Sequence, residues 1–396
     1  MELNKIYNED CLSGLRKLPS ESVDCVFTSP PYWALRDYGD SVQSVWDGDS
    51  SCQHEWGEKI NKKVSTNFNE GFNERCGQSA GQRKQEEAKP KDICQGNFCV
   101  KCGAWRGQLG LEPTFQLYIK HLCDIFDEVK RVLKPEGNCW VNLGDTYGTV
   151  SGGSKQLTTG NKKQYGQINH DNRFGTMQEK PKKMHKCLVQ IPSRFAIEMT
   201  NRGWILRNEI IWYKRNCMPS SVKDRFTVDF EKVFLFSKNQ KYFFNQIRVP
   251  HNPDSIKRAC RARVSQKLDA KQYQHSRKND YTGYENMQER FESGELSHAV
   301  HPQGRNMRCV WDITPKPFKE AHFAVFPEEL AERVIKAGCP GGGVVLDPFF
   351  GSGTVGVASL KQGKKFVGFE LNPEYIKIAE ARLKPHLSQK KLEGFA

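Results

Sequence analysis

The chain carries near its C-terminus the stretch Val344-Val345-Leu346-Asp347-Pro348-Phe349-Phe350-Gly351-Ser352-Gly353-Thr354-Val355-Gly356. A short apolar run enters a glycine-rich turn, and apolar residues from Val355 onward begin a helix. Gly351 and Gly353 let the backbone come close to a ligand, and the amide groups of the helix N-terminus are free to bind it. Strand, glycine turn and helix in this order predict a parallel α/β sheet with a ligand site at its edge.

A second strand, Phe366 to Glu370, follows about twenty residues later and ends in an acid. That is the placement of a carboxylate that accepts both ribose hydroxyls of a nucleoside. The spacing of Gly351, Gly353 and Gly356 also matches the Gly-x-Gly-x-x-Gly motif of dinucleotide-binding proteins. By this pattern alone, NAD remains an alternative ligand. Asp347 favours a ligand with an aminoacyl ammonium group, because it would repel a pyrophosphate. No Gly-Lys-Ser/Thr follows, which argues against a nucleotide hydrolase.

The hexapeptide Thr28-Ser29-Pro30-Pro31-Tyr32-Trp33 closes another apolar strand, Val23 to Phe27. Two prolines fix φ and remove two amide donors, which leaves a stiff backbone whose carbonyls are free to accept. Ser29 adds a hydroxyl, and Tyr32 and Trp33 offer flat faces for a planar ring. These features predict a site for the exocyclic amino group of an aromatic base; the alternative is a proline turn with exposed aromatics.

Ser29-Pro30-Pro31-Tyr32 resembles the signature of the DNA amino-methyltransferases, in which Ser, Asp or Asn precedes Pro-Pro and an aromatic residue. The 344–356 stretch resembles the S-adenosylmethionine motif of the same family, and 322–327 resembles the segment that covers the methionine end. The Pro-Pro motif precedes the glycine motif, as in the permuted β group. The resemblance implies catalytic roles for Ser29, Pro30, Pro31 and Tyr32, and cofactor contacts from Asp10, Phe326, Asp347, Phe349, Gly351, Ser352, Gly353, Thr354 and Glu370. The sequence predicts Asp10 to be a helix N-cap. Either this is its only role, or it also contacts the adenosine of the cofactor.

The resemblance further implies a doubly wound, mostly parallel, seven-stranded methyltransferase sheet. It implies methyl transfer to a base flipped out of duplex DNA, with the base stacked on Tyr32 and its amino group held by the Ser29 hydroxyl and the Pro30 carbonyl. Serine at the first position favours cytosine N4 over adenine N6. A non-catalytic DNA-binding module, and methylation of RNA or of a protein glutamine, are the other hypotheses. An accompanying restriction enzyme and the oligomeric state stay open.

Composition agrees with a nucleic-acid partner. Sixty Lys and Arg against 46 Asp and Glu give a formal charge of +14, which attracts a polyanion. No apolar run approaches the ~20 residues that span a bilayer, and Met1 to Asn4 has no signal-peptide character, so we expect a cytoplasmic protein without a membrane segment. The 14 cysteines are expected to be mostly buried thiols rather than disulfides.

A polar stretch from Trp46 to about Lys91 predicts a long loop, and metal-ligand types stand at its ends. Cys52 and His54 precede it, and Cys99 and Cys102 follow it. Two close pairs of such ligands predict one structural zinc ion, with Cys76 and Cys94 as spare candidates. The alternative is a set of ordinary cysteines in a mobile segment.

The remaining elements complete the expected layout. We expect helices at 12–18, 109–133 and 191–201, and strands at 138–145, 204–213 and 230–236, of which the last two form a hairpin at the sheet edge. A basic loop, 149–183, and a basic, aromatic region, 246–308, lack periodicity; the second is the expected target-recognition region. The predicted division is 1–45 with 105–245 as the catalytic part, 46–104 as the zinc insertion, 246–308 for target recognition, and 309–396 for the cofactor.

Overall fold

The computed structural model describes residues 1–39, 42–57, 97–148, 184, 186–252, 254, 301, 303–315 and 326–393. Its strands are β1 (Lys5–Tyr7), β2 (Val23–Thr28), β3 (Ser44–Trp46), β4 (Trp105–Gly107), β5 (Leu133–Leu143), β6 (Ile205–Tyr213), β7 (Phe230–Ser237), β8 (Arg248–Val249), β9 (Arg305–Asn306), β10 (Val310–Asp312), β11 (Val344–Asp347) and β12 (Lys365–Phe369). Its helices are α1 (Cys11–Lys17), α2 (Phe115–Val132), α3 (Ile191–Asn201), α6 (Glu328–Gly338), α7 (Thr354–Lys361) and α8 (Pro373–Glu393).

An eight-stranded sheet in the order β1-β12-β11-β2-β5-β7-β6-β10 forms the centre of the molecule. Only β7 runs against the others, because it pairs antiparallel with both β5 and β6. The predicted α/β, mostly parallel fold is therefore confirmed. The strand number of seven is one too low, and the β6–β7 hairpin is not at the edge: β10 pairs parallel with β6 and lies outside it.

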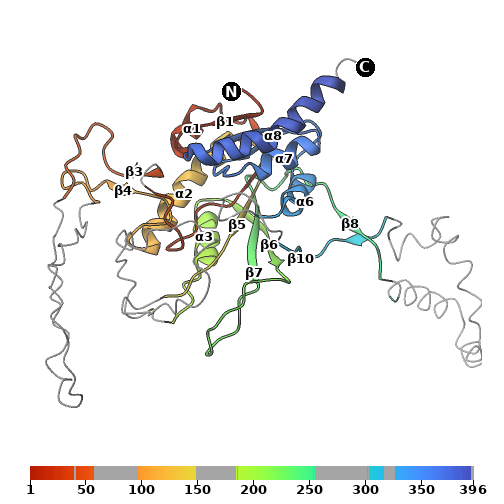
Figure 1. Cartoon of the computed structure of the whole chain (residues 1–396), viewed down its shortest axis with the longest axis horizontal. Helices are drawn as coiled ribbons and strands as arrows, with labels where there is room; N and C mark the ends of the chain where they lie inside the picture. The colour runs from red at the N-terminus through yellow and green to blue at the C-terminus, as the bar shows by residue number, and fades with distance from the viewer. Residues whose placement is uncertain are drawn as a thin grey trace, which may run out of the picture.

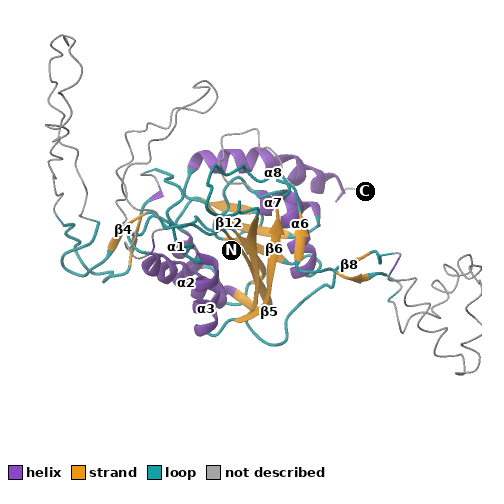
Figure 2. Cartoon of the chain, turned by 90° about the horizontal axis from the view of Figure 1, so that it is seen from below, coloured by secondary structure: helices purple, strands orange, loops and turns teal. Residues whose placement is uncertain are grey.

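Helices cover both faces of the sheet, as the doubly wound fold requires (Figure 2). On one face α1, α2 and α3 pack side by side, and on the other α6, α7 and α8 do so. The amphipathic α2 buries ten side chains, among them Leu122, Phe126 and Val129, against the first face. Apolar cores result on both sides of the sheet, and a third apolar cluster joins α7 and α8 to β12.

The predicted helix at 109–133 is shorter than expected, and the strand after it begins earlier. Thr114 caps α2 through a hydrogen bond from the amide of Leu117, so the helix starts at Phe115. The segment Lys134 to Gly137, which we expected to separate helix and strand, lies inside β5. β5 accommodates Pro135 there because its register with β2 shifts between Leu133 and Asn138.

A buried asparagine joins the middle of the sheet to its surroundings. Asn138 Nδ2 donates to the carbonyls of Gly338 at 2.8 Å and Phe243 at 2.9 Å, and Oδ1 accepts from Trp140 Nε1 at 2.7 Å. The side chain thereby connects β5 to α6 and to the segment after β7. It holds the amino-terminal rim of the sheet, opposite the rim at which the parallel strands end.

The polar insertion returns to the body of the molecule as a small hairpin. β3 pairs antiparallel with β4, with Trp46 opposite Trp105 (Figure 1). Both indole rings stack on the buried imidazole of His121, at centroid distances of 4.9 and 5.6 Å. The base of the insertion is thus fixed against α2. No helix of the described part of the chain is long and apolar enough to span a bilayer.

Candidate functional site

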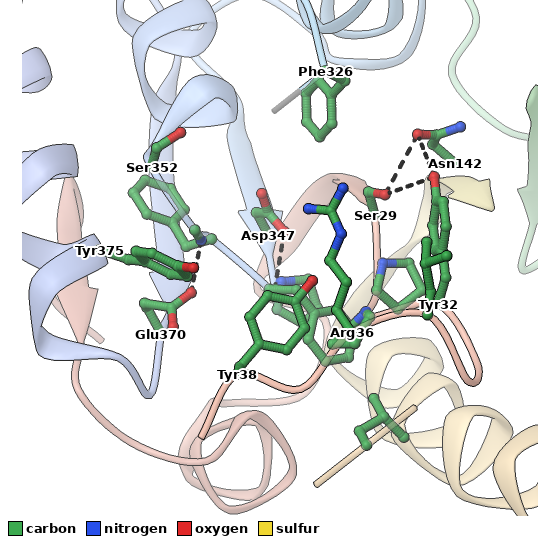
Figure 3. A pocket seen from close by; sticks show the side chains of 18 of the residues that line it. Ser29, Tyr32, Arg36, Tyr38, Asn142, Phe326, Asp347, Ser352, Glu370 and Tyr375 are labelled. Atoms are coloured by element: carbon green, nitrogen blue, oxygen red, sulfur yellow. Dashed lines mark hydrogen bonds between the residues drawn. The ribbon is translucent and has the colours of Figure 1, made fainter. Parts of the chain in front are cut away.

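One cavity of about 580 Å³ opens at the rim where the parallel strands end. The glycine turn after β11 and the acid after β12 line one half of it, and the Pro-Pro segment after β2 lines the other half. Figure 3 shows Glu370 and Asp347 on one side and Ser29 and Tyr32 on the other. The volume lies within the range of about 300–1,000 Å³ of small-molecule sites. The fold therefore joins two motifs that stand more than three hundred residues apart.

The glycine turn needs two of its three glycines for backbone conformation. Gly351 has φ 52° and Gly353, which precedes α7, has φ 82°. A Cβ on Gly353 would also lie 2.9 Å from that of Ala379. Gly356 has another role, since a Cβ there would meet the ring of Phe350 at 2.7 Å. The third glycine of the dinucleotide-like pattern therefore permits packing of Phe350 against α7.

Ser352 and Thr354 are buried, and their hydroxyl groups are engaged by α8. Arg382 Nη1 donates to Ser352 Oγ at 3.0 Å, to Thr354 Oγ1 at 3.1 Å and to the Ser352 carbonyl at 2.7 Å. The two side chains thus shape the turn, and both residues still line the cavity.

The acid after β12 is fixed in the position that the sequence predicted. Glu370 Oε2 accepts from the Gly351 amide at 2.8 Å and Oε1 from the Asn372 amide at 2.7 Å. Burial raises the pKa of this carboxyl. Each oxygen retains acceptor capacity, so the group can take further donors from a ligand. Asp10 also lines the cavity, and it caps α1 by accepting from the Ser13 amide at 3.0 Å.

Asp347 is the most deeply buried acid of the cavity. Its Oδ1 accepts from Thr28 Oγ1 at 2.6 Å and from the Phe349 amide at 3.0 Å. Burial raises the pKa of Asp347 to about 7. A cationic ligand group would restore the charged form, since an opposite charge favours ionisation. Phe349 and Phe326 add apolar surface to the cavity. The ring of Phe326 packs against that of Phe27, with 4.9 Å between the ring centroids.

The Pro-Pro segment differs from expectation in two details. Trp33 is only 2% exposed and donates its indole N–H to the Glu112 carbonyl, so it packs in the core and offers no face to a base. The Pro31 carbonyl accepts from Tyr118 Oη at 2.8 Å. Within the described part of the chain, the Pro30 carbonyl has no such partner. The stiff segment therefore presents one free carbonyl rather than two.

Tyr32 belongs to a polar cluster that the sequence did not reveal. Its hydroxyl lies 2.8 Å from Glu231 Oε2 and 3.1 Å from Asn142 Oδ1, and Ser29 Oγ lies 3.4 Å from the same Asn142 oxygen. Lys214 pairs with the other oxygen of Glu231. Burial raises the pKa of Tyr32 well above its usual value, so the phenol stays a hydrogen-bond donor. Asn142 lies near the end of the predicted strand 138–145, and this position was the available signal for it. Glu231 is the second residue of β7, and no sequence pattern pointed to it.

Arg36, Tyr38 and Tyr375 are among the cavity-lining residues that the sequence did not predict. Figure 3 shows the Arg36 guanidinium pointing into the cavity near Asp347. Its Nη1 is buried and has no hydrogen-bond partner among the described residues. A buried guanidinium nitrogen without a partner fits a ligand that brings an anionic oxygen.

The four predicted metal ligands converge at the base of the insertion. The ligand atoms of Cys52, His54, Cys99 and Cys102 all lie within 4.8 Å of one another. Cys52 and Cys99 sulfurs are 4.0 Å apart, and Cys102 Sγ lies 3.4 Å from His54 Nδ1. The sequence placed these residues 45 or more positions apart in two pairs, and the β3–β4 hairpin brings the pairs together.

Several predictions concern residues outside the described part of the chain. They are the spare cysteines Cys76 and Cys94, the whole basic loop 149–183, most of the region 246–308, and the segment 322–325.

The chain matches a family of known proteins. The family model for DNA methylases of the N6/N4 class matches residues 23–381. Type II methyltransferase M.Cfr9I of Citrobacter freundii is 32% identical over 385 residues, which are 97% of this chain and 89% of that protein. Type II methyltransferase M.SmaI of Serratia marcescens is 31% identical over 383 residues, with 96% and 90% covered.

Solved structures align with this chain as well. The cytosine-N4-specific PvuII DNA methyltransferase aligns with 96% of this chain and 85% of its own at a TM-score of 0.48 and 17% identity. A putative DNA modification methylase of Thermus thermophilus, complexed with S-adenosyl-L-methionine, aligns at a TM-score of 0.46 and 18% identity, with 96% and 93% covered.

Proposed function

Because the chain belongs to the N6/N4 family of DNA methylases, we propose that it methylates the exocyclic N4 of cytosine in duplex DNA with S-adenosylmethionine as donor. The observation that carries the proposal is the single cavity, which is lined by the glycine turn and by the Pro-Pro segment. A donor site and an acceptor site that share one cavity let the methyl group pass directly between them.

The residues around the glycine turn fit the methyl donor. Glu370 would accept the ribose hydroxyls, and Asp10 would face the adenosine from the end of the neighbouring strand β1. Asp347 would bind the ammonium of the methionine moiety. The unpartnered Nη1 of Arg36 suits its carboxylate. When bound there, S-adenosylmethionine supplies an electrophilic methyl group on a sulfonium. Phe326, Phe349, Gly351, Ser352, Gly353 and Thr354 complete the proposed donor site.

The acceptor half orients the amino group of the target base. The Pro30 carbonyl and the Ser29 hydroxyl would accept its two N–H bonds, with Asn142 Oδ1 beside them as a further acceptor. These acceptors stabilise the positive charge that develops on the nitrogen as it gains a methyl group. The extra proton then leaves the nitrogen for solvent, and no covalent intermediate with a cysteine is needed.

Tyr32 provides the face on which the base stacks, and its neighbours hold it in place. Glu231 fixes the phenol through a 2.8 Å contact, and Lys214 neutralises the charge of Glu231. Gly144 packs against the Tyr32 ring, since a Cβ there would lie 2.5 Å from a ring carbon. Ser29, Pro30 and Asn142 form the acceptor site for the amino group, which we call the cradle. The Tyr32 ring is held at the mouth of the cradle before DNA arrives, which lowers the free-energy cost of ordering the ring on binding.

The target base is the finer part of the proposal. Serine at position 29 favours cytosine N4, by its resemblance to the cytosine-specific signature; adenine N6 is the second candidate, because its amino group suits the same cradle. Mass spectrometry of nucleosides from DNA incubated with the protein and labelled donor separates the two. N4-methylcytosine is expected. N6-methyladenine would reassign the base, and unlabelled DNA would refute DNA methylation and favour the non-catalytic module, or RNA or protein glutamine as substrate.

The partners follow from the same chemistry. Duplex DNA suits the charge of +14, and we propose that the protein acts in the cytoplasm beside a restriction enzyme of the same specificity. The region 246–308 is the proposed target-recognition part, with 1–45 and 105–245 as the catalytic part and 309–396 as the donor-binding part. An extract of the source organism that cuts unmethylated DNA but not DNA treated with this protein would support the pairing.

We further propose one structural zinc ion in the 46–104 insertion. A tetrahedral zinc with Zn–S of about 2.3 Å places its sulfurs about 3.8 Å apart, close to the 4.0 Å between Cys52 and Cys99. With three thiols and the His54 imidazole the set is complete and leaves no open position, which is typical of structural rather than catalytic zinc. Metal analysis of chelator-washed protein should find one zinc per chain; finding none would remove the proposal.

A further inference from the structure

The connection between β6 and β7, residues 214–229, exposes apolar side chains to an unusual degree. Phe226 is 96% exposed and Met218 is 88% exposed, and Val222 and Val228 are 41% and 50% exposed. Figure 1 shows this connection as a green loop that extends beyond the sheet below β7. A cluster of large exposed apolar side chains on one loop marks a surface that another molecule covers.

The loop stands at the acceptor end of the cavity. Met218 and Val228 line the cavity together with Lys214. A hydrogen bond of 2.7 Å from the Lys214 amide to the Asp229 carbonyl closes the base of the loop. β6 and β7 therefore hold the loop beside the Tyr32 cradle. A duplex that delivers a base to this cradle must contact the loop.

The charges on the loop favour a polyanion as the molecule that covers it. The loop carries four cationic residues, Lys214, Arg215, Lys223 and Arg225, and two acidic ones, Asp224 and Asp229, which gives a local charge of +2. Lys214 pairs with Glu231, Arg215 with Asp312, and Asp224 with Lys186. Lys223 and Arg225, close to Phe226 in the chain, are therefore the cations that would meet phosphates. Apolar tips between cationic side chains suit DNA, because the cations meet phosphates while an apolar group enters between bases.

We propose that Phe226 enters the duplex beside the target base and fills the space that the base leaves when it flips out. This inference rests on the proposed methyl transfer and adds the device that opens the duplex. A phenyl ring buries about 150–250 Å² when it is enclosed. That contact compensates for the stacking that the flipped base loses, with Met218 at the rim of the cavity as a second apolar contact.

The test compares two duplexes that contain the site methylated by the wild-type protein. One is fully paired, and the other carries a mismatch opposite the target base, which makes flipping easier. Phe226→Ala should methylate the paired duplex about 10- to 100-fold more slowly than wild type, and the mismatched duplex within about threefold of it. Phe226→Leu should retain most of the activity on both duplexes.

Phe244→Ala is the matched control, because Phe244 is 44% exposed and follows the segment bound to Asn138 at the opposite rim of the sheet. It should equal wild type on both duplexes. The proposal is overturned if Phe226→Ala methylates the paired duplex at the wild-type rate, or if it loses activity equally on both. A change from dimer to monomer in Phe226→Ala with unchanged rates would assign the loop to a protein contact instead. Methylation of DNA by the wild type tests the proposed function separately.

Discussion

Replacing Asp347 with asparagine should stabilise the ligand-free protein at pH 8 and weaken its binding of S-adenosylmethionine. The carboxyl is fully buried, and its Oδ1 accepts hydrogen bonds from Thr28 Oγ1 at 2.6 Å and from the Phe349 amide at 3.0 Å. An asparagine in the same rotamer keeps both bonds through its amide oxygen. The substitution therefore removes the charge and little else.

The magnitude follows from the pKa of the buried carboxyl. Burial raises the pKa of Asp347 from 3.8 to about 7, and at about 1.4 kcal/mol per pH unit the difference of 3.2 costs about 4 kcal/mol of unfolding free energy at pH 8. Between pH 4 and 7 the folded protein keeps a proton that the unfolded chain has released. The unfolding free energy of the wild-type protein therefore falls as the pH rises through this window. Asp347→Asn has no carboxyl at this position, so its unfolding free energy does not fall for this reason.

The effect is measured by urea unfolding of both proteins at pH 5 and pH 8. Any difference in unfolding free energy between the two proteins that does not depend on pH cancels in this comparison. The stability advantage of Asp347→Asn should widen by about 2.5 kcal/mol from pH 5 to pH 8. In calorimetric titrations, the wild-type Kd for S-adenosylmethionine should weaken about tenfold per unit below pH 7, because the carboxyl must lose its proton to bind the ammonium.

The variant should bind S-adenosylmethionine about 10- to 100-fold more weakly at pH 8, for loss of one charged hydrogen bond. Its affinity should not share the pH dependence of the wild type. An advantage in stability that does not change with pH, or wild-type affinity in the variant, would refute the reasoning.

Three other predictions concern the catalytic cradle, the sheet and the metal. Ser29→Ala and Tyr32→Ala should lose most of their turnover in a methyl-transfer assay while binding S-adenosylmethionine normally by calorimetry, and a fully active double variant would contradict their assignment. Asn138→Ala should lower the unfolding free energy in urea by about 2–4 kcal/mol, because the Trp140 N–H and two carbonyls lose their partner; an unchanged midpoint would contradict it. Cys102→Ser should abolish the proposed zinc binding and lower the thermal midpoint, and unaltered zinc content would exclude Cys102 as a ligand.

Local backbone chemistry made much of the fold predictable. The strand, glycine turn and helix at 344–361 depend on contacts between near neighbours, so the pattern predicted β11 and α7 where they lie. The boundaries that failed depend on distant partners. β5 starts at Leu133 because β2 pairs with it there, and β10 joins the sheet through β6. A short strand such as β10 has too few residues to show a period of its own.

The amino-acid sequence by itself determined the two motifs, the order in which they occur and the acid after β12, because prolines, glycines and strand ends act on their own backbone. Only the tertiary structure decided which groups face the cavity. It turned Trp33 into the core, engaged the Pro31 carbonyl with Tyr118, and brought Glu231 to the Tyr32 hydroxyl. Those contacts join residues that are 79 or more positions apart. Contacts between such distant residues depend on strand order and helix packing, and local sequence patterns do not predict them.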